Sequence, residues 1–309
     1  MEGAMKATLP EHKEDVTHAI AHFEDHHHEA RMPFGKFFLY TGAQLALAFG
    51  LFYWIAPDVF RAEFQMPLAM FGWVVVLGLP LSLFEYLYHR YLLHSAVFPF
   101  LGSMHRSHTH HHGLTNVKAP ITAKDPDKMV PVDNKYAIEE EPQEESMMFP
   151  VYAISIFYAL FMVLMGIPYK LLFPGQPIIA ATLIVTTLGY GLYEFWHGIM
   201  HLPYDRFWKP ALTHPIFGKR MRYVYSFHLM HHWRPSMNLA VVGFWGFAVW
   251  DHLFKTHHRP EHTPLVQSEV NYWDAGFFPP AWPIQVLDKI QAKLVRWSRS
   301  IEKKAGWKR

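Results

Sequence analysis

The chain has 309 residues, of which 51% are hydrophobic and 17% are charged, with 23 histidines and a formal net charge of +2. It contains no cysteine, which excludes disulfides, thiolate zinc sites, cysteine-ligated iron–sulfur clusters and a cysteine nucleophile, so nitrogen and oxygen atoms must hold any metal. The apolar composition predicts one hydrophobic unit rather than two soluble domains, and the near-neutral charge argues against nucleic acid as a partner.

Residues 1–36 are polar and form the first predicted segment. The stretch HKEDVTHAIAHFEDHHHEAR (12–31) has the composition of a short, exposed amphipathic helix. A signal peptide does not fit, because the start lacks a basic region and an early apolar region. The histidines here do not follow a metal-box spacing, and we expect them to face solvent or lipid headgroups: His12, His18, His22, His26, His27 and His28.

Four later stretches are mostly apolar and about 20 residues long, which is the length that crosses a hydrocarbon core of ~30 Å. A buried helix of a soluble protein is more often shorter and apolar on one side only. The sequence therefore predicts four transmembrane helices, over residues 37–56, 68–88, 148–166 and 177–196.

Short turns are expected to join these spans into two hairpins. The turns, 57–67 and 167–176, contain one basic residue each. The N-terminus, the 89–147 connection and the 197–309 tail must then lie on the opposite side, which carries nearly all the Lys and Arg residues. The positive-inside rule makes that side cytoplasmic.

These expectations define the fold class and the domain organisation. We predict an all-α integral membrane protein with four transmembrane helices in two hairpins and a cytoplasmic helical cap that holds a histidine-rich site for two metal ions. Residues 1–36 form the polar N-terminal segment, 37–256 the membrane domain and 257–309 a C-terminal tail.

Ten histidines fall into four spaced boxes, all on the predicted cytoplasmic side. Two boxes have the pattern His-x-x-His-His, and residues three and four apart share one face of a helix. Neutral imidazole is the commonest protein ligand for transition metals. Ten ligands are too many for one ion and suit two, so we predict these as metal ligands: His89, His94, His108, His111, His112, His197, His201, His228, His231 and His232.

Spacing within the boxes bears on which ion each ring would bind. Adjacent rings such as those of His111 and His112 diverge by ~100°, which suits binding to two neighbouring ions. His89 and His94 are five residues apart, so that pair needs either a helix end or different ions. A single spaced pair in a chain so rich in histidine would be weak evidence, whereas two triplets and two pairs on one membrane face are specific.

The remaining histidines and two carboxylates receive weaker predictions. His105 and His110 are expected to lie outside the ligand set, and His257, His258 and His262 in the tail. Metal-bound histidines commonly donate their second N–H to a carboxylate. Glu85 and Glu194 precede His89 and His197 by about one turn, and we expect them to orient ligand rings, the alternative being carboxylates that simply reach the membrane interface.

The boxes and spans together resemble the fatty acid hydroxylase (sterol desaturase) superfamily, and most closely its fatty acid and sphingolipid 2-hydroxylases. FEYLYHRYLLH resembles the first box of that branch, GYGLYEFWHGIMH the third, and YSFHLMHHWRPSMNLAVVGFWGFAVWDHLFKT the fourth. The second box is closer to plant wax aldehyde-decarbonylating members, where a similar His-x-His-His-His precedes Pro-Ile-Thr. Residues 37–115 and 177–256 carry the resemblance.

The resemblance implies a membrane monooxygenase that uses a non-haem di-iron centre and O₂ to hydroxylate an aliphatic C–H bond of a lipid. It implies two iron ions on the ten box histidines, with zinc as an alternative in overexpressed protein, and no further catalytic side chain. Asn238 and Asp251, in and after the fourth box, join Glu85 and Glu194 as expected supports of the ligand rings. Two departures are the absence of a cytochrome b5 domain and a long acidic insertion at 117–147.

The sequence is also compatible with other functions. Desaturation, sterol or carotenoid oxidation and aldehyde deformylation use similar boxes, and a membrane protein that transports or stores metal is a candidate from another class. Transport would predict polar or histidine residues in mid-span, where the four stretches are almost wholly apolar. With no flavin, haem or iron–sulfur motif, the enzyme would need an external electron donor such as cytochrome b5, a ferredoxin or a reductase.

The C-terminal stretch IQVLDKIQAKLVRWSRSIEKK predicts an amphipathic helix with basic residues beside an apolar face. That face contains Ile284, Leu287, Ile290, Leu294, Trp297 and Ile301. Such a helix either lies on an anionic membrane surface or packs on the cap, and the sequence does not separate the two. The chain ends without a KDEL-type signal, and we favour a bacterial inner membrane over the endoplasmic reticulum.

Overall fold

The computed structural model of the chain describes residues 34–114, 129–131, 149–150, 152–202, 204–258, 269–271 and 279–306. Their regular elements are helices apart from one two-stranded antiparallel sheet, in which β1 (Met129–Pro131) pairs with β2 (Glu269–Asn271). The six N-terminal histidines, His262 and most of the 117–147 insertion lie outside the described residues.

Four helical segments are long and apolar enough to cross a membrane: Phe34–Ile55, Pro67–Leu93, Ala153–Leu172 and Ile178–Met200. Their outward surfaces carry large apolar side chains, and Leu47, Trp54 and Leu68 are 73%, 78% and 87% exposed. A soluble protein rarely exposes apolar surface on this scale. The prediction of four membrane spans is therefore supported by both the length and the surface of these helices.

The first two spans are α2 (Phe34–Ile55) and α4 (Pro67–Tyr88), and a short helix, α3 (Pro57–Phe64), connects them. Span two continues past α4 through one turn of π-helix, η1 (His89–Leu93). The observed bounds are close to the predicted 37–56 and 68–88. The added turn matters because it carries the first histidine box.

The third span differs more from its prediction. Residues 148–166 were expected to be helical and 167–176 to form a turn, but the helix runs through α7 (Ala153–Phe161), the π-turn η4 (Met162–Gly166) and α8 (Ile167–Leu172). Pro168 does not end the helix, because it lies in the first turn of α8, where a missing N–H breaks no hydrogen bond that the new helix needs. The turn itself is confined to residues 173–177.

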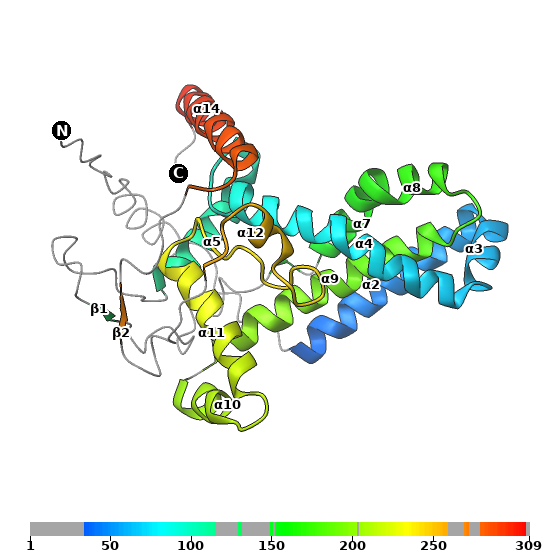
Figure 1. Cartoon of the computed structure of the whole chain (residues 1–309). Coiled ribbons are helices and arrows are strands. Elements are labelled where there is room, and N and C mark those ends of the chain that lie inside the picture. Colours follow the sequence, from blue (N-terminus) through cyan, green and yellow to red (C-terminus); the bar gives the residue numbers. More distant parts are fainter. Residues whose placement is uncertain are drawn as a thin grey trace.

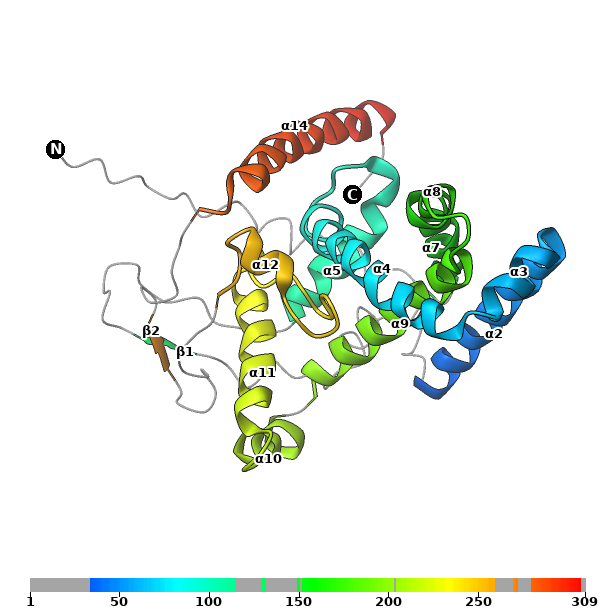
Figure 2. The ribbon, with the colours of Figure 1, turned by 45° about the vertical axis from the view of Figure 1, so that its right-hand side comes forward.

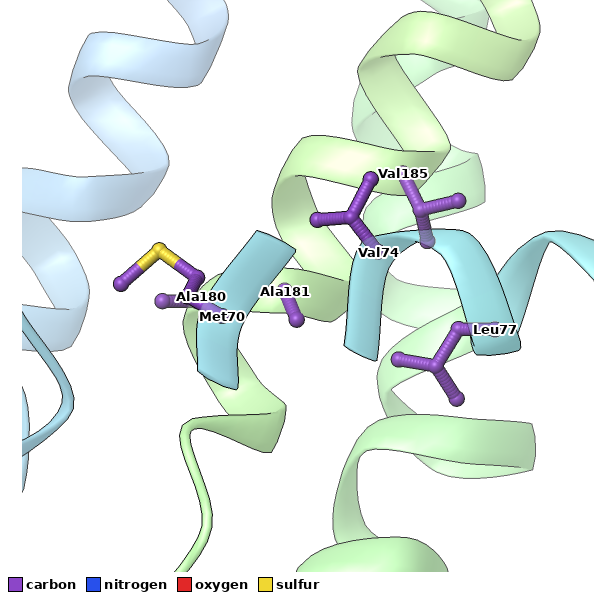
Figure 3. Packing of buried hydrophobic residues seen from close by; sticks show 6 residues of the cluster. All are labelled: Met70, Val74, Leu77, Ala180, Ala181 and Val185. Atoms are coloured by element: carbon purple, nitrogen blue, oxygen red, sulfur yellow. The ribbon is translucent and has the colours of Figure 1, made fainter. Parts of the chain in front are cut away.

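The fourth span, α9 (Ile178–Met200), is the central helix of the bundle. It contacts α2, α4 and α7. Of an apolar 18-residue stretch of α9, 56% is buried inside the protein, against 6% of such a stretch of α2. On α4, Met70, Val74 and Leu77 follow one helical face and pack against Ala180, Ala181 and Val185 of α9 (Figure 3). The two alanines let the helix backbones approach closely, as small residues do between membrane helices.

A partly buried ion pair joins the connecting helix α3 to α8, the last part of span three, at the end of the bundle where Figure 1 shows both helices. The Glu63 carboxylate lies 2.7 Å from Lys170 Nζ and accepts the Ala180 N–H at 2.8 Å. Glu63 thereby caps the N-terminus of α9, where the helix dipole favours negative charge. The opposite end of the bundle carries the histidines.

The remaining helices gather at that opposite end (Figures 1 and 2). They are the 3₁₀ turn η2 (Pro99–Leu101), α5 (Gly102–Leu114), the π-turn η5 (Tyr204–Trp208), α10 (Lys209–Thr213), α11 (Gly218–Trp233), α12 (Val249–Leu253) and α14 (Trp282–Ala305). A small core formed by Met200, Trp208, Leu212, Tyr225 and Leu229 packs α11 against the end of α9.

We expect Glu63→Gln to lower the melting temperature of the protein in detergent. The variant leaves the half-buried Lys170 without its anion, and breaking a fully buried pair typically costs about 3–5 kcal/mol, which is an upper limit here. Asp58→Asn is the matched control, because Asp58 pairs with Arg61 in the same connection but is 94% exposed. Equal melting temperatures for the two variants would contradict the structural role of Glu63.

Candidate metal centre

The ten box histidines converge from four helical elements at one end of the bundle. The end of α4 and η1 supplies the first box, α5 the second, the end of α9 the third and α11 the fourth. The rings form two groups, and the nitrogen atoms within each group lie within 4.8 Å of one another. We call them group A (His89, His94, His108, His112 and His231) and group B (His111, His197, His201, His228 and His232).

Each His-x-x-His-His triplet divides between the two groups. On α5, His108 and His112 belong to group A and His111 to group B. On α11, His231 belongs to group A, whereas His228 and His232 belong to group B. Adjacent rings point in directions about 100° apart on a helix, so one helix reaches both groups at once. This is the arrangement that the spacing predicted for His111 and His112.

The π-turn η1 brings the two histidines of the first box together. A π-helix closes hydrogen bonds between residues five apart, and the His94 N–H donates to the His89 carbonyl at 3.3 Å. The two rings therefore stack with centroids 5.1 Å apart, and both belong to group A. Of the two alternatives for this pair, the structure shows the helix end, with both rings in one group. That the two rings bind one ion stays a prediction.

Ring nitrogens within each group face one another. In group A, His108 Nε2 lies 3.2 Å from His89 Nε2 and 3.1 Å from His94 Nε2. In group B, His201 Nε2 lies 3.1 Å from His228 Nε2. Two imidazole nitrogens bound at 2.0–2.1 Å to one ion, at angles of 90–109°, are separated by about 2.9–3.4 Å. The nitrogen spacing therefore fits one transition-metal ion in each group.

Burial favours the neutral form of these rings. All members of group B are buried, and so are His89, His108 and His231 of group A. Burial, reinforced by neighbouring histidines, lowers the pKa of His94, His108 and His112 in group A well below 6.5. The same causes lower the pKa of His111, His228 and His232 in group B. A neutral imidazole keeps a lone pair for a metal, and imidazole suits iron, zinc, copper and nickel.

Two backbone carbonyls set the orientation of ligand rings in group A. His89 Nδ1 lies 2.5 Å from the Leu239 carbonyl oxygen, and His231 Nδ1 lies 2.8 Å from that of Met237. A carbonyl only accepts, so each Nδ1 carries the proton and each Nε2 keeps its lone pair. Both Nε2 atoms face other histidines of group A, at 3.2 Å. The carbonyls thus select the tautomer that a metal requires.

The loop that supplies these carbonyls is held by two carboxylates. Five consecutive backbone N–H groups, those of residues 239–243, donate to Glu85 or Asp251 at 2.6–3.0 Å. Glu85, which was expected to orient a ligand ring, accepts from this loop with both of its oxygens and so supports the rings through the loop. Asp251 supports the rings in the same indirect way, and its burial raises the pKa of its carboxyl group.

Asn238 and Glu194 also support the surroundings of the site. Asn238 adopts a left-handed backbone (φ 51°), and its side-chain amide donates to the carbonyls of Phe227 and His258. It thereby fixes the loop beside Met237 and Leu239. One oxygen of Glu194 accepts the Phe149 N–H at 3.0 Å. A role of Glu194 in orienting His197 stays a prediction.

The other histidines are placed outside the two groups. His105 Nδ1 bonds the Leu93 carbonyl at 2.9 Å and so ties α5 to the π-turn. His110 is buried but belongs to neither group. His257 bonds the Tyr223 hydroxyl at 3.0 Å, and the His258 backbone N–H donates to Asn238. Sequence reasoning missed the carbonyls of Met237 and Leu239, because main-chain groups leave no signal in residue identity.

An apolar pocket adjoins the histidine groups inside the bundle. It runs along α4 from Gly78 to Tyr88, and the rise of a helix makes that length about 15 Å. Phe84 and Phe161 line its wall, with ring centroids 4.8 Å apart. Tyr193 lies at the histidine end, 5.7 Å from the ring of His197.

Trp245 closes the other end of the pocket. Its indole N–H donates to the Val75 carbonyl at 3.1 Å, and it packs against Gly78, where a Cβ atom would lie 2.5 Å from the indole nitrogen. Gly78 is therefore required for this close approach. The pocket thus extends from the histidine groups toward the middle of span two. The outer surface of this part of the bundle is apolar.

Comparison with protein-family models, with curated proteins and with solved structures gave no match. The resemblance of the histidine boxes to the fatty acid hydroxylase superfamily therefore stays a prediction.

Single alanine variants of the five histidines of α5 test the assignment of ligands. We expect His108→Ala, His111→Ala and His112→Ala to lose most bound metal and activity, because each ring belongs to group A or B. His105→Ala and His110→Ala should retain more of both, since losses outside the ligand set typically cost about 10–100-fold. Metal content and activity would be measured at matched membrane expression.

Two results would contradict this assignment. If His110→Ala loses its metal and His111→Ala retains it, the register assigned to the ligands of α5 is wrong. A uniform mild effect in all five variants would mean that the helix holds no metal.

Proposed function

We propose that the chain is a membrane-bound di-iron oxidoreductase that hydroxylates an aliphatic C–H bond of a lipid. The observation that carries the proposal is the pair of five-histidine groups at one end of an apolar pocket between membrane-spanning helices. The resemblance of the boxes to membrane hydroxylases points to the same chemistry.

The overall reaction inserts one oxygen atom of O₂ into the C–H bond and reduces the other to water. It consumes two electrons and two protons, and yields one alcohol. Iron bound to the two groups would supply the O₂ chemistry, which amino acid side chains cannot supply alone. Because the chain has no cysteine for an iron–sulfur cluster, the electrons would come from a separate donor protein.

The residues of this chain would bind the ions, align the substrate and exclude water. Groups A and B would hold one ion each, and two carbonyls of the loop 237–243 keep the His89 and His231 rings of group A in the metal-binding tautomer. Phe84, Phe161 and their neighbours line a path for an acyl chain, so that its methylene groups are buried as in a protein core. Tyr193, beside His197, lies where the chain would pass from the pocket to the metals.

Desaturation is the second candidate, because the pocket would hold the same acyl chain and the two outcomes differ only in the placement of the reacting carbon. Metal transport receives less support. The histidines of both groups lie at one end of the bundle, and the middle of each span contains no histidine and no acidic residue in the sequence. An ion crossing a bilayer needs polar partners at mid-span.

Lipid mass spectrometry of expressing cells tests the reaction. We expect lipids that gain one oxygen atom in cells with the wild-type chain and not in cells with His231→Ala, which removes a ligand of group A. Lipids that instead lose two hydrogen atoms would support desaturation. Identical lipid profiles in the two strains, at equal membrane expression and with iron and O₂ supplied, would contradict both.

We further propose that the histidine end and both termini face the cytoplasm, in a bacterial inner membrane. The chain contains no cysteine, so single cysteines can report topology without background. We expect an impermeant maleimide to label Gly175→Cys, in the turn between α8 and α9, on intact cells. Lys219→Cys, exposed at the start of α11, should be labelled only after the cells are opened. The reverse pattern would contradict this orientation.

A further inference from the structure

The C-terminal helix α14 presents three different faces. One face packs on the protein, one carries exposed apolar side chains, and one carries basic side chains. The apolar face predicted from the sequence is only partly right, because Ile284 points inward and is fully buried beside Tyr86 and Leu239. The other apolar residues are at least partly exposed.

The face of α14 that packs on the protein is mainly polar. Asp288 accepts two hydrogen bonds from the Arg90 guanidinium, at 2.8 and 3.0 Å, and a third from the Tyr91 hydroxyl at 2.9 Å. Gln291 donates to the Ser95 hydroxyl. A helix that used its apolar stripe to join the cap would show the opposite arrangement. These contacts hold α14 in place and leave its apolar residues free for another environment.

The exposed apolar side chains form a continuous stripe. Val286, Ile290 and Trp297 follow helical spacing and are 46%, 46% and 51% exposed. Trp282 is 75% exposed at the start of the helix, and Leu287 is 37% exposed. We call these five residues the apolar stripe of α14.

Basic residues border the stripe on its other side. Every basic residue of α14 is exposed: Lys289, Lys293, Arg296, Arg299, Lys303 and Lys304. The helix has two acidic residues, of which Asp288 is engaged by Arg90 and Glu302 is buried. The charge that α14 presents outward is therefore positive from Lys289 to Lys304.

The attachment points of α14 place it at the end of a membrane span. Arg90 and Tyr91 belong to η1, the last turn of the span Pro67–Leu93. Figures 1 and 2 show α14 beside this end of the bundle, outside the group of spans. A helix held there meets the boundary between hydrocarbon and headgroups.

From these observations we propose that the apolar stripe of α14 inserts into the bilayer interface, with its basic face on anionic lipid headgroups. Interfacial helices combine these two faces, and tryptophan is enriched at the level of the headgroups. Trp282 and Trp297 lie toward the two ends of the stripe, so both ends have an interfacial anchor. A bilayer is favoured over a protein partner because the membrane that holds the spans reaches this position. The proposal does not depend on the reaction catalysed.

Site-directed labelling of the full chain in lipid nanodiscs tests the proposal. Ile290→Cys places a single thiol on the stripe, and Ala292→Cys places one on the exposed basic side as a matched control. Each is labelled with a small fluorophore in discs that contain phosphatidylglycerol. We expect a nitroxide-labelled lipid to quench the label at 290 severalfold more than the label at 292. Acrylamide, a neutral aqueous quencher, should show the reverse order.

Charge reversal tests the lipid headgroups. Lys289→Glu, Lys293→Glu and Arg296→Glu together, in the Ile290→Cys background, should reduce lipid quenching at 290 in anionic discs. Lys219→Glu on α11 is the control, and gel filtration of each variant would show that it folds. Lipid quenching unchanged by the triple reversal would overturn the part played by anionic headgroups.

Two further outcomes would overturn the proposal as a whole. Equal quenching of both labels by acrylamide, without lipid quenching, would mean that the stripe faces water. Protection of the label at 290 from both quenchers would mean that protein covers the stripe, from a second copy or another partner.

Discussion

Ten imidazole rings gathered at one end of a helix bundle, eight of them buried, are the constraint on which the rest of this structure depends. Burying several cationic rings side by side would be very costly, so the rings must be neutral. Each ring must also direct a nitrogen lone pair toward its group. In group A this is achieved for His89 and His231 by carbonyls of the 237–243 loop. Glu85 and Asp251 hold that loop through its backbone N–H groups.

The same loop connects the metal centre to the membrane part of the bundle. Its far end, at Trp245, reaches Val75 and Gly78 in the middle of span two and closes the apolar pocket. Glu85 lies on span two between Gly78 and His89, and it also lines the pocket. One short stretch of backbone therefore contacts both the apolar pocket and two rings of group A.

Much of this arrangement follows from residue patterns. Long apolar stretches indicated the four spans, and helical spacing indicated the ten histidines and the division of His111 from His112. Local backbone geometry could not be predicted in the same way. The π-turn that brings His94 beside His89, and the passage of the third span through Pro168, depend on tertiary packing. The partners of Glu85 and Asp288 depend on contacts between residues more than 150 positions apart, which a single sequence does not reveal.

The central claim is that the two histidine groups are two separate metal sites. Metal analysis of washed, purified protein from iron-supplemented cells tests it most directly. Since each group offers five nitrogen ligands, we expect a reproducible content of two ions per chain. A content of one ion or none per chain, in protein that is folded and monodisperse, would contradict it.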